Sequence, residues 1–159
     1  MTVVVPGLLD RLMSSTQAAP GSRTGAALEQ LKAGVARDLE ALLNTRAGCP
    51  PQIFDDYPQA RASILNYGLI DFAAFSLSSS EDRAAICASL KDAIERHEPR
   101  LRKVSATLHG SVNRLDIVIH ATLHVAGSAE AVDFDAVLQP SSLHYSISLN
   151  QRTRRWTST

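Results

Sequence analysis

Glu98-Pro99-Arg100-Leu101 is the stretch of sequence at which a helical pattern ends and a run of strands begins. Proline lacks a backbone donor and disfavours helical geometry at the residue before it, so we expect an extended Glu98. Side chains two residues apart in an extended segment point the same way. Glu98 and Arg100 are therefore predicted to pair on one face, with Pro99 turned to the other. The pair is interpreted either as a structural salt bridge or as a rigid recognition element.

Two amphipathic helices are predicted before this junction, one from Ala26 to about Asn44 and one from about Ser80 to His97. Their apolar residues recur at the spacing of one helix face. These residues are Leu28, Leu31, Val35, Leu39 and Leu42 in the first helix, and Ile86, Leu90 and Ile94 in the second. A capping box from Ser78 to Glu81 is expected to start the second helix.

A proline-rich loop, residues 44–58, is expected between the two helices. Pro58 is well placed as the first residue of a short helix through Leu65, which Gly68 would close. Phe72 and Phe75 are expected to anchor the next connection against the core.

After the junction, the apolar residues alternate with period two in four segments, residues 104–108, 115–125, 132–138 and 143–149. Turn-forming residues separate these segments in order: Gly110 and Asn113, then Gly127 and Ser128, then Pro140 and Ser141. This pattern predicts a meander of about four antiparallel strands with one buried face. Helices followed by strands indicate an α+β domain, with the N-terminal helices packed on one face of the sheet.

The predicted organisation is a single domain with an extension at each end. Residues 1–25 are interpreted as an N-terminal arm, with a short helix over 7–13 and a flexible linker after it. The domain covers residues 26–149, and residues 150–159 form a basic tail. The arm either packs on its own domain or docks on a neighbouring protein. The tail is either solvated or contacts a partner.

Composition indicates a globular protein without a strong electrostatic preference. The chain has 159 residues, of which 45% are hydrophobic, and its 16 basic residues balance its 16 acidic ones. This balance argues against nucleic acid or an anionic membrane as a partner. No apolar run is long enough to insert across a membrane, and no secretory signal is expected. Two cysteines in different elements suit a reducing compartment, so a cytoplasmic location is expected.

Tests for catalytic chemistry are unfavourable, and we expect no enzyme activity, no cofactor and no metal. Phosphate-binding, dinucleotide and nucleophile-elbow motifs are absent. His120 and His124 would lie about 13 Å apart on a strand, too far to share an ion. A glycosidase needs a protonated carboxyl group, for which Glu98 is the candidate, and a second carboxylate. Asp116, Asp133 or Asp135 would have to supply the second one. Arg100 would keep Glu98 charged, the opposite of what a general acid needs.

Four stretches, in this order, resemble the TssE family, the baseplate subunits of type VI secretion systems. The family is related to the lysozyme-like wedge proteins of contractile phage tails. The matching stretches are Leu8-Leu9-Asp10-Arg11-Leu12, Asp38-Leu39-Glu40-Ala41-Leu42-Leu43-Asn44-Thr45-Arg46, Ser63-Ile64-Leu65-Asn66-Tyr67-Gly68-Leu69-Ile70-Asp71 and Glu98-Pro99-Arg100-Leu101. The chain departs from the pattern at Ala47, where many relatives are expected to carry a second arginine.

The resemblance implies a structural role in assembly. A member of this family would join the wedge subunits TssF and TssG, contact TssK, and help start polymerisation of the TssB/TssC sheath. It would use Glu98, Pro99, Arg100 and Leu101 as the partner-binding segment. An edge strand among residues 115–149 would accept strands from the first sheath ring, because unpaired sheet edges are templates for strand addition. A muramidase-like enzyme and a small-ligand binding module remain as alternatives.

The two interpretations of the Glu98 and Arg100 pair predict different mutant behaviour. An exposed pair contributes only about 0–1 kcal/mol, whereas removing one partner of a desolvated pair costs roughly 3–5 kcal/mol. If both groups face a partner protein, Glu98→Ala or Arg100→Ala should leave thermal stability nearly unchanged and abolish co-purification with the wedge. Lost stability with binding retained would indicate a structural pair.

Overall fold

The computed structural model describes residues 24–72, 75–109, 115–125, 128–139 and 144–150. The helix expected over residues 7–13 and nearly all of the basic tail lie outside this part of the chain. The elements are helix α2 (Thr24–Leu43), 3-10 helix η1 (Pro51–Phe54), helix α3 (Pro58–Arg61), 3-10 helix η2 (Ile64–Asn66), helix α4 (Ser80–His97) and strands β1 (Leu101–His109), β2 (Asp116–Val125), β3 (Ser128–Gln139) and β4 (His144–Leu149).

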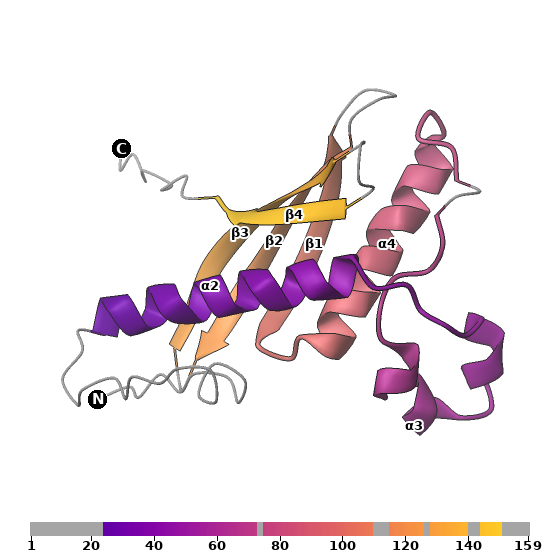
Figure 1. The fold of residues 1–159 in the computed structure, drawn as a ribbon, viewed down its shortest axis with the longest axis horizontal. Coiled ribbons are helices and arrows are strands. Elements are labelled where there is room, and N and C mark those ends of the chain that lie inside the picture. The colour runs from indigo at the N-terminus through magenta and orange to yellow at the C-terminus, as the bar shows by residue number, and fades with distance from the viewer. Residues whose placement is uncertain (1–23, 73–74, 110–114, 126–127, 140–143, 151–159) are drawn as a thin grey trace.

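The strands form one antiparallel sheet in the order β1-β2-β3-β4, so each strand pairs with its neighbour in sequence. The two long helices lie along opposite ends of this order, α2 beside β4 and α4 beside β1 (Figure 1). The α+β class and the meander predicted from the alternating pattern are therefore confirmed.

The core forms between the helices and one face of the sheet. In β2, every second residue from Ile117 to Val125 is buried, and Phe134 at the centre of β3 is fully buried. The helices contribute the apolar stripe predicted from their spacing, with Val35, Leu39 and Leu90 at 0% exposure. Burial of this apolar surface supplies the main favourable term in folding.

Strand β1 contains a β-bulge that the alternating pattern did not predict. Leu101 and Val104 are both buried although they are three residues apart, which a regular strand with period two does not allow. The pairing with β2 shifts between Arg102 and Ser105, and Lys103 has a left-handed φ of 53°. One extra residue is thus accommodated directly after the Glu98–Leu101 stretch.

Two predicted helix details are corrected by the structure. Helix α4 is capped by Ser79, one residue later than expected, and the Ser79 hydroxyl accepts a hydrogen bond from the Asp82 N–H at 3.3 Å. The Asp82 carboxylate accepts from the N–H of Ser76 instead of completing a capping box. The short helix from Pro58 ends at Arg61 and not at Leu65.

Gly68 follows the 3-10 helix η2, where the chain passes close to the end of α2. Its φ is +115°, and a Cβ at this position would lie 2.6 Å from the carbonyl oxygen of Thr45. The close approach allows the Leu69 N–H to donate to Thr45 and the Ala47 N–H to donate to Leu69, each at 2.8 Å. Glycine is needed here because another side chain would clash with this backbone.

Candidate functional site

Glu98 is the residue that ends α4. Its N–H donates to the carbonyl of Ile94 at 2.8 Å, whereas its φ of −124° and ψ of 76° leave the helical region. This confirms the helix end expected from Pro99. Glu98 is 5% exposed and is the one buried charged residue in the part of the chain that the structure describes. A buried carboxylate requires a charged or hydrogen-bonding partner.

Arg100 is that partner, so the predicted pair is confirmed, but the expected extended geometry is wrong. The segment is a turn, in which the Glu98 carbonyl accepts a hydrogen bond from the Leu101 N–H at 3.0 Å. The Nε of Arg100 lies 2.5 Å from Glu98 Oε1, and its Nη2 contacts Oε2 of the same carboxylate. The two contacts form a bidentate arginine–carboxylate pair, which is strong and geometrically specific. The Glu98 hydrogen bond raises the pKa of Arg100, burial opposes this shift, and Asp38 adds to it.

Asp38 on α2 completes the charged cluster, which we define as Asp38, Glu98 and Arg100. Its Oδ2 lies 2.5 Å from Arg100 Nη2, although the two residues are 62 positions apart in the chain. Arg100 thus joins the end of α4 to the side of α2. Sequence reasoning did not single out Asp38 as a partner, because an acidic residue on an exposed helix face carries no sign of a distant contact.

The residues of this region differ in what they present to solvent. Glu98 and Leu101 are buried, at 5% and 1% exposure, and Pro99 is exposed. The side chain of Arg100 is 27% exposed and that of Asp38 is 56% exposed. A partner protein could therefore touch Pro99, Arg100 and Asp38, while Glu98 and Leu101 hold the segment in place from the inside.

Tyr67 and His97 lie next to the charged cluster. Their rings meet edge to face at 5.2 Å, and His97 Nε2 lies 3.0 Å from the carbonyl oxygen of Asn66. Burial raises the pKa of Tyr67, and the negative charges of Asp38 and Glu98 raise it further. Burial lowers the pKa of His97 against the effect of the Asn66 hydrogen bond. Three of the four stretches that carry the family resemblance thus meet at one place.

The second carboxylates considered for a glycosidase lie in a different part of the molecule. Asp116, Asp133 and Asp135 line a cavity of about 670 Å³, and Glu98 is not among its lining residues. Asp133 contacts His120, with Oδ1 and Nδ1 2.7 Å apart. Within the described residues, no group of three histidine, cysteine or acidic side chains is arranged to hold a metal ion. None of the described helices is long and apolar enough to cross a membrane.

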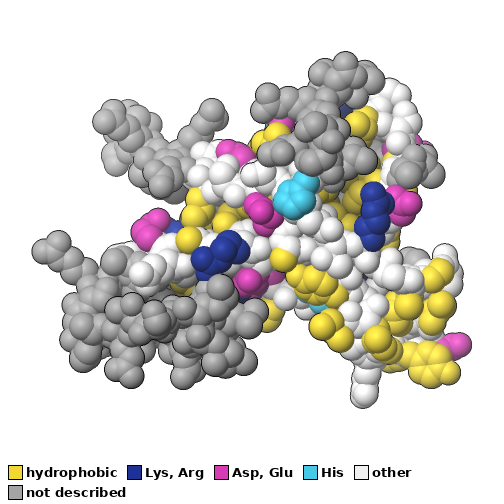
Figure 2. All heavy atoms as spheres, in the orientation of Figure 1, with side chains coloured by type: hydrophobic (Ala, Val, Ile, Leu, Met, Phe, Trp, Pro, Cys, Tyr) yellow, Lys and Arg dark blue, Asp and Glu magenta, His cyan; other side chains and the backbone are white. Residues whose placement is uncertain are grey.

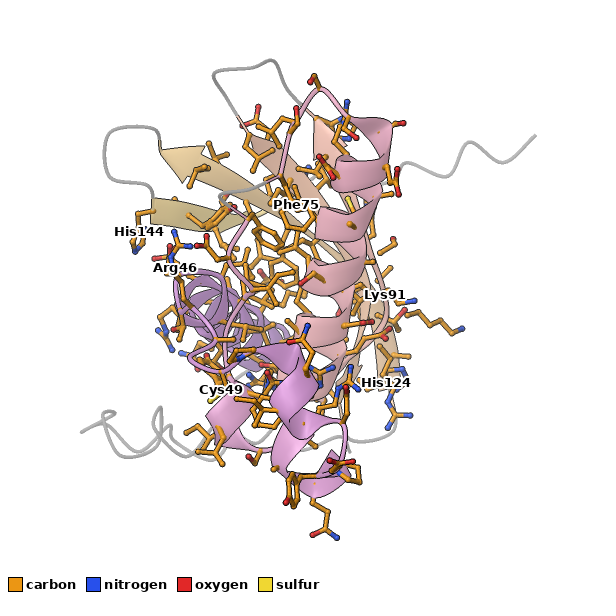
Figure 3. All side chains as sticks on the ribbon, turned by 90° about the vertical axis from the view of Figure 1, so that its right-hand side faces the viewer. Arg46, Cys49, Phe75, Lys91, His124 and His144 are labelled. Carbon is orange, nitrogen blue, oxygen red and sulfur yellow. The ribbon has the colours of Figure 1, made fainter. Side chains whose placement is uncertain are left out.

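A smaller cavity of about 330 Å³ lies where the end of α2 meets residues 69–77 and the sheet. Phe72 and Phe75 line it and contact each other edge to face at 5.7 Å. Both pack against the core, as predicted, and Figure 3 shows Phe75 beside α4. The lining is largely apolar, with the exposed Arg46–Asp71 ion pair among its residues.

An apolar surface group occurs on the segment around α3. Figure 2 shows hydrophobic side chains gathered at the lower right, where Figure 1 places this segment. The exposed residues of the group are Ile53, Tyr57, Ile64 and Leu65, and Ile64 reaches 83% exposure. Sequence reasoning missed this group because it assigned part of the segment to a longer helix. Exposed apolar clusters are typical of protein-contact surfaces.

The fold and the site define a small α+β protein with a charged cluster at its helix–sheet junction and an apolar surface group beside it. Residues 29–128 match the model of the family described as baseplate wedge protein gp25. The chain belongs to this family, whose members are structural components of a baseplate. The matched region contains the charged cluster and ends at the start of β3, so β4 lies outside it.

Among solved structures, the chain is similar to one described as "The baseplate complex from the type VI secretion system". The similarity has a TM-score of 0.48 and 19% sequence identity, and it covers 70% of this chain and 96% of that chain. A search of curated proteins finds no match to this sequence.

Proposed function

We propose that the chain is a TssE-type subunit that docks on the TssF and TssG subunits of a type VI secretion baseplate and helps to start the sheath. The observation that carries the docking proposal is the charged cluster, in which a buried Glu98 holds Arg100 at the surface beside Asp38. Under this proposal the chain works in the cytoplasm, and TssK is a further contact. Family membership supports the baseplate role, and the four resembling stretches support the type VI assignment.

The charged cluster suits a docking role for a physical reason. The bidentate pair fixes the arginine, so little side-chain entropy remains to be lost when a partner binds. The cluster contains two carboxylates and one guanidinium, and Asp38 remains accessible on α2. This favours a partner surface that brings a hydrogen-bond donor or a basic group against Asp38.

Co-purification with TssF and TssG tests the docking surface. Asp38→Ala should reduce recovery of the complex while leaving the fold stable, because Asp38 is more than half exposed. Arg46→Ala is the matched control, since the Arg46–Asp71 pair is also an exposed ion pair but lies beyond the end of α2. Wild-type recovery by a folded Asp38→Ala variant and a folded Arg100→Ala variant would overturn the assignment.

The apolar surface group provides a second test of docking in the same assay. Ile64→Glu should keep the free energy of unfolding, because this side chain is 83% exposed, and should weaken co-purification if a partner covers the group. Gln52→Glu is a suitable control, because it adds the same charge at an exposed position of the same segment. Equal recovery of both variants would remove the group from the interface.

Under this proposal, sheath initiation uses a sheet edge among residues 115–149 that accepts a partner strand. Removing residues 150–159, or placing a proline in β4, should block sheath growth from the baseplate while the fold is retained. Normal sheath assembly by such a folded variant would contradict this part of the proposal. A peptidoglycan turbidity assay tests the enzymatic alternative, and the purified chain should not clear the suspension.

A further inference from the structure

The outer edge of β4 is where a partner strand would add to this sheet. The Asn150 N–H donates to the carbonyl of Asp133 at 2.8 Å, which places even-numbered residues of this segment toward β3. In an antiparallel pair the hydrogen-bonding direction alternates along the strand. The backbone groups of Tyr145, Ile147 and Leu149 therefore point away from the sheet.

Side chains of α2 and of the residue that follows it already bond to this edge. The Tyr145 N–H donates to Asn44 Oδ1, and Asn44 Nδ2 donates to the Tyr145 carbonyl, both at 2.8 Å. The Ile147 N–H donates to Glu40 Oε2 at 2.9 Å. Figure 1 shows α2 lying along β4, and Figure 3 shows Arg46 and His144 on the same side of the molecule. We call these three hydrogen bonds the α2 edge contact.

The α2 edge contact takes the place of a neighbouring strand. The Asn44 carboxamide offers one acceptor and one donor to Tyr145, as a residue of a fifth strand would. Asn44 is itself fixed at the end of α2, because its Nδ2 also donates to the Glu40 carbonyl at 2.8 Å. The N–H and the carbonyl of Tyr145 are therefore both hydrogen-bonded and do not pair with another chain. Native proteins protect exposed sheet edges by covering them in this way.

The opposite edge of the sheet is closed in a different way. Two side chains of α4 bond to the backbone of β1. Glu95 accepts from the Val104 N–H, and Arg83 donates to the Leu108 carbonyl. Strand β1 also contains the bulge at Lys103, which disrupts a regular ladder. Strand β4, in contrast, pairs with β3 without a register shift, so its geometry suits further strand pairing.

We propose that the α2 edge contact is a displaceable cover, and that an extended segment of a partner protein pairs with Tyr145 and Ile147 only after Asn44 and Glu40 release them. This inference rests on the proposed function, under which the partner is a sheath subunit. Three backbone hydrogen bonds replace the three contacts with α2, so the exchange keeps both β4 donors and the Tyr145 carbonyl bonded. The free chain therefore presents a closed edge, and the edge opens when a strand is supplied.

Backbone amide exchange of the full chain tests the cover directly. Glu40→Ala should speed exchange of the Ile147 amide by about tenfold, because that N–H loses its acceptor. Glu40→Gln is the matched control, since the glutamine carbonyl retains an acceptor, and exchange should stay near the wild-type rate. Asn44→Ala should do the same at Tyr145 and should make the chain self-associate at concentrations where the wild type is monomeric. Unchanged exchange and unchanged association in folded variants would overturn the cover.

Sheath polymerisation from the assembled baseplate tests the displacement. Glu40→Ala should shorten the lag before sheath growth, whereas Glu40→Gln should match the wild type. A faster-exchanging variant with an unchanged lag would show that the partner strand does not displace Glu40, which overturns the inference. If the wild-type chain itself starts no sheath, the proposed function fails, and the exchange and association measurements still decide whether the edge is covered.

Discussion

Two of the polar contacts that helix α2 and its end make with the rest of the molecule differ in what could replace them. Asp38 meets Arg100 in the charged cluster, where the buried Glu98 needs a cation that no backbone group provides. Glu40 and Asn44 form hydrogen bonds with backbone groups of β4. The backbone of any neighbouring strand could form these hydrogen bonds instead. The first contact is therefore expected to be permanent, and the second is expected to be exchangeable.

Breaking the charged cluster should give the largest effect. Glu98→Ala leaves the partly buried Arg100 without its bidentate partner, and the free energy of unfolding should fall by about 3 kcal/mol. Chemical denaturation measures the loss, with Asp71→Ala as the control for an exposed ion pair. A loss of about 1 kcal/mol or less, as the docking interpretation of the sequence led us to expect, would indicate that Arg100 is stabilised by solvent or by Asp38 when Glu98 is absent.

A change of pH should separate the two contacts with a smaller effect. The pKa of His97 is lowered by burial, so the folded state prefers neutral His97, and this preference favours folding above the unfolded value of 6.5. Stability should fall as the pH drops from about 6.5 through the lower folded pKa of His97. The α2 edge contact should not weaken over this pH range, because it contains no histidine.

Denaturation at pH 7.5 and at pH 5.5 measures this loss. His97→Gln should reduce the difference between the two pH values, and exchange of the Tyr145 amide, corrected for its intrinsic pH dependence, should report no local opening at β4. An unchanged pH dependence in His97→Gln would remove His97 as its source.

The bulge that follows the charged cluster should give the smallest effect. Lys103 has a φ of 53°, which glycine adopts freely and a β-branched residue resists. Lys103→Gly should stay close to the stability of the wild type, whereas Lys103→Val should lose about 1 kcal/mol. Equal stability of the two variants in thermal denaturation would show that the left-handed backbone at Lys103 is not required.

Local features of the fold were predictable from local patterns. Pro99 ends α4 because its geometry disfavours a helical Glu98, and the turn over residues 98–101 brings Glu98 and Arg100 within reach of each other. Alternating apolar residues identified β2 and β3 because one face of each is buried. The predictions placed the cap of α4 and the end of α3 a few residues away from Ser79 and Arg61, where the structure has them. Several serines and apolar residues compete for those positions.

Contacts between distant segments were not predictable in this way. Nothing near Asp38 indicates that it meets Arg100, and nothing near Asn44 indicates that it bonds to Tyr145, which is 101 positions away. The bulge at Lys103 also escaped the period-two pattern, because the pattern records which residues are apolar and not where the pairing with β2 shifts.

The sequence by itself determined the order of helices and strands, the junction at Pro99 and the pairing of Glu98 with Arg100, because each depends on neighbours within a few residues. Only the tertiary structure decided that Glu98 is buried, that Asp38 joins it, and that Glu40 and Asn44 cover the edge of β4. Burial and edge coverage depend on how α2, α4 and the sheet pack together, and packing brings together groups that are far apart in the chain.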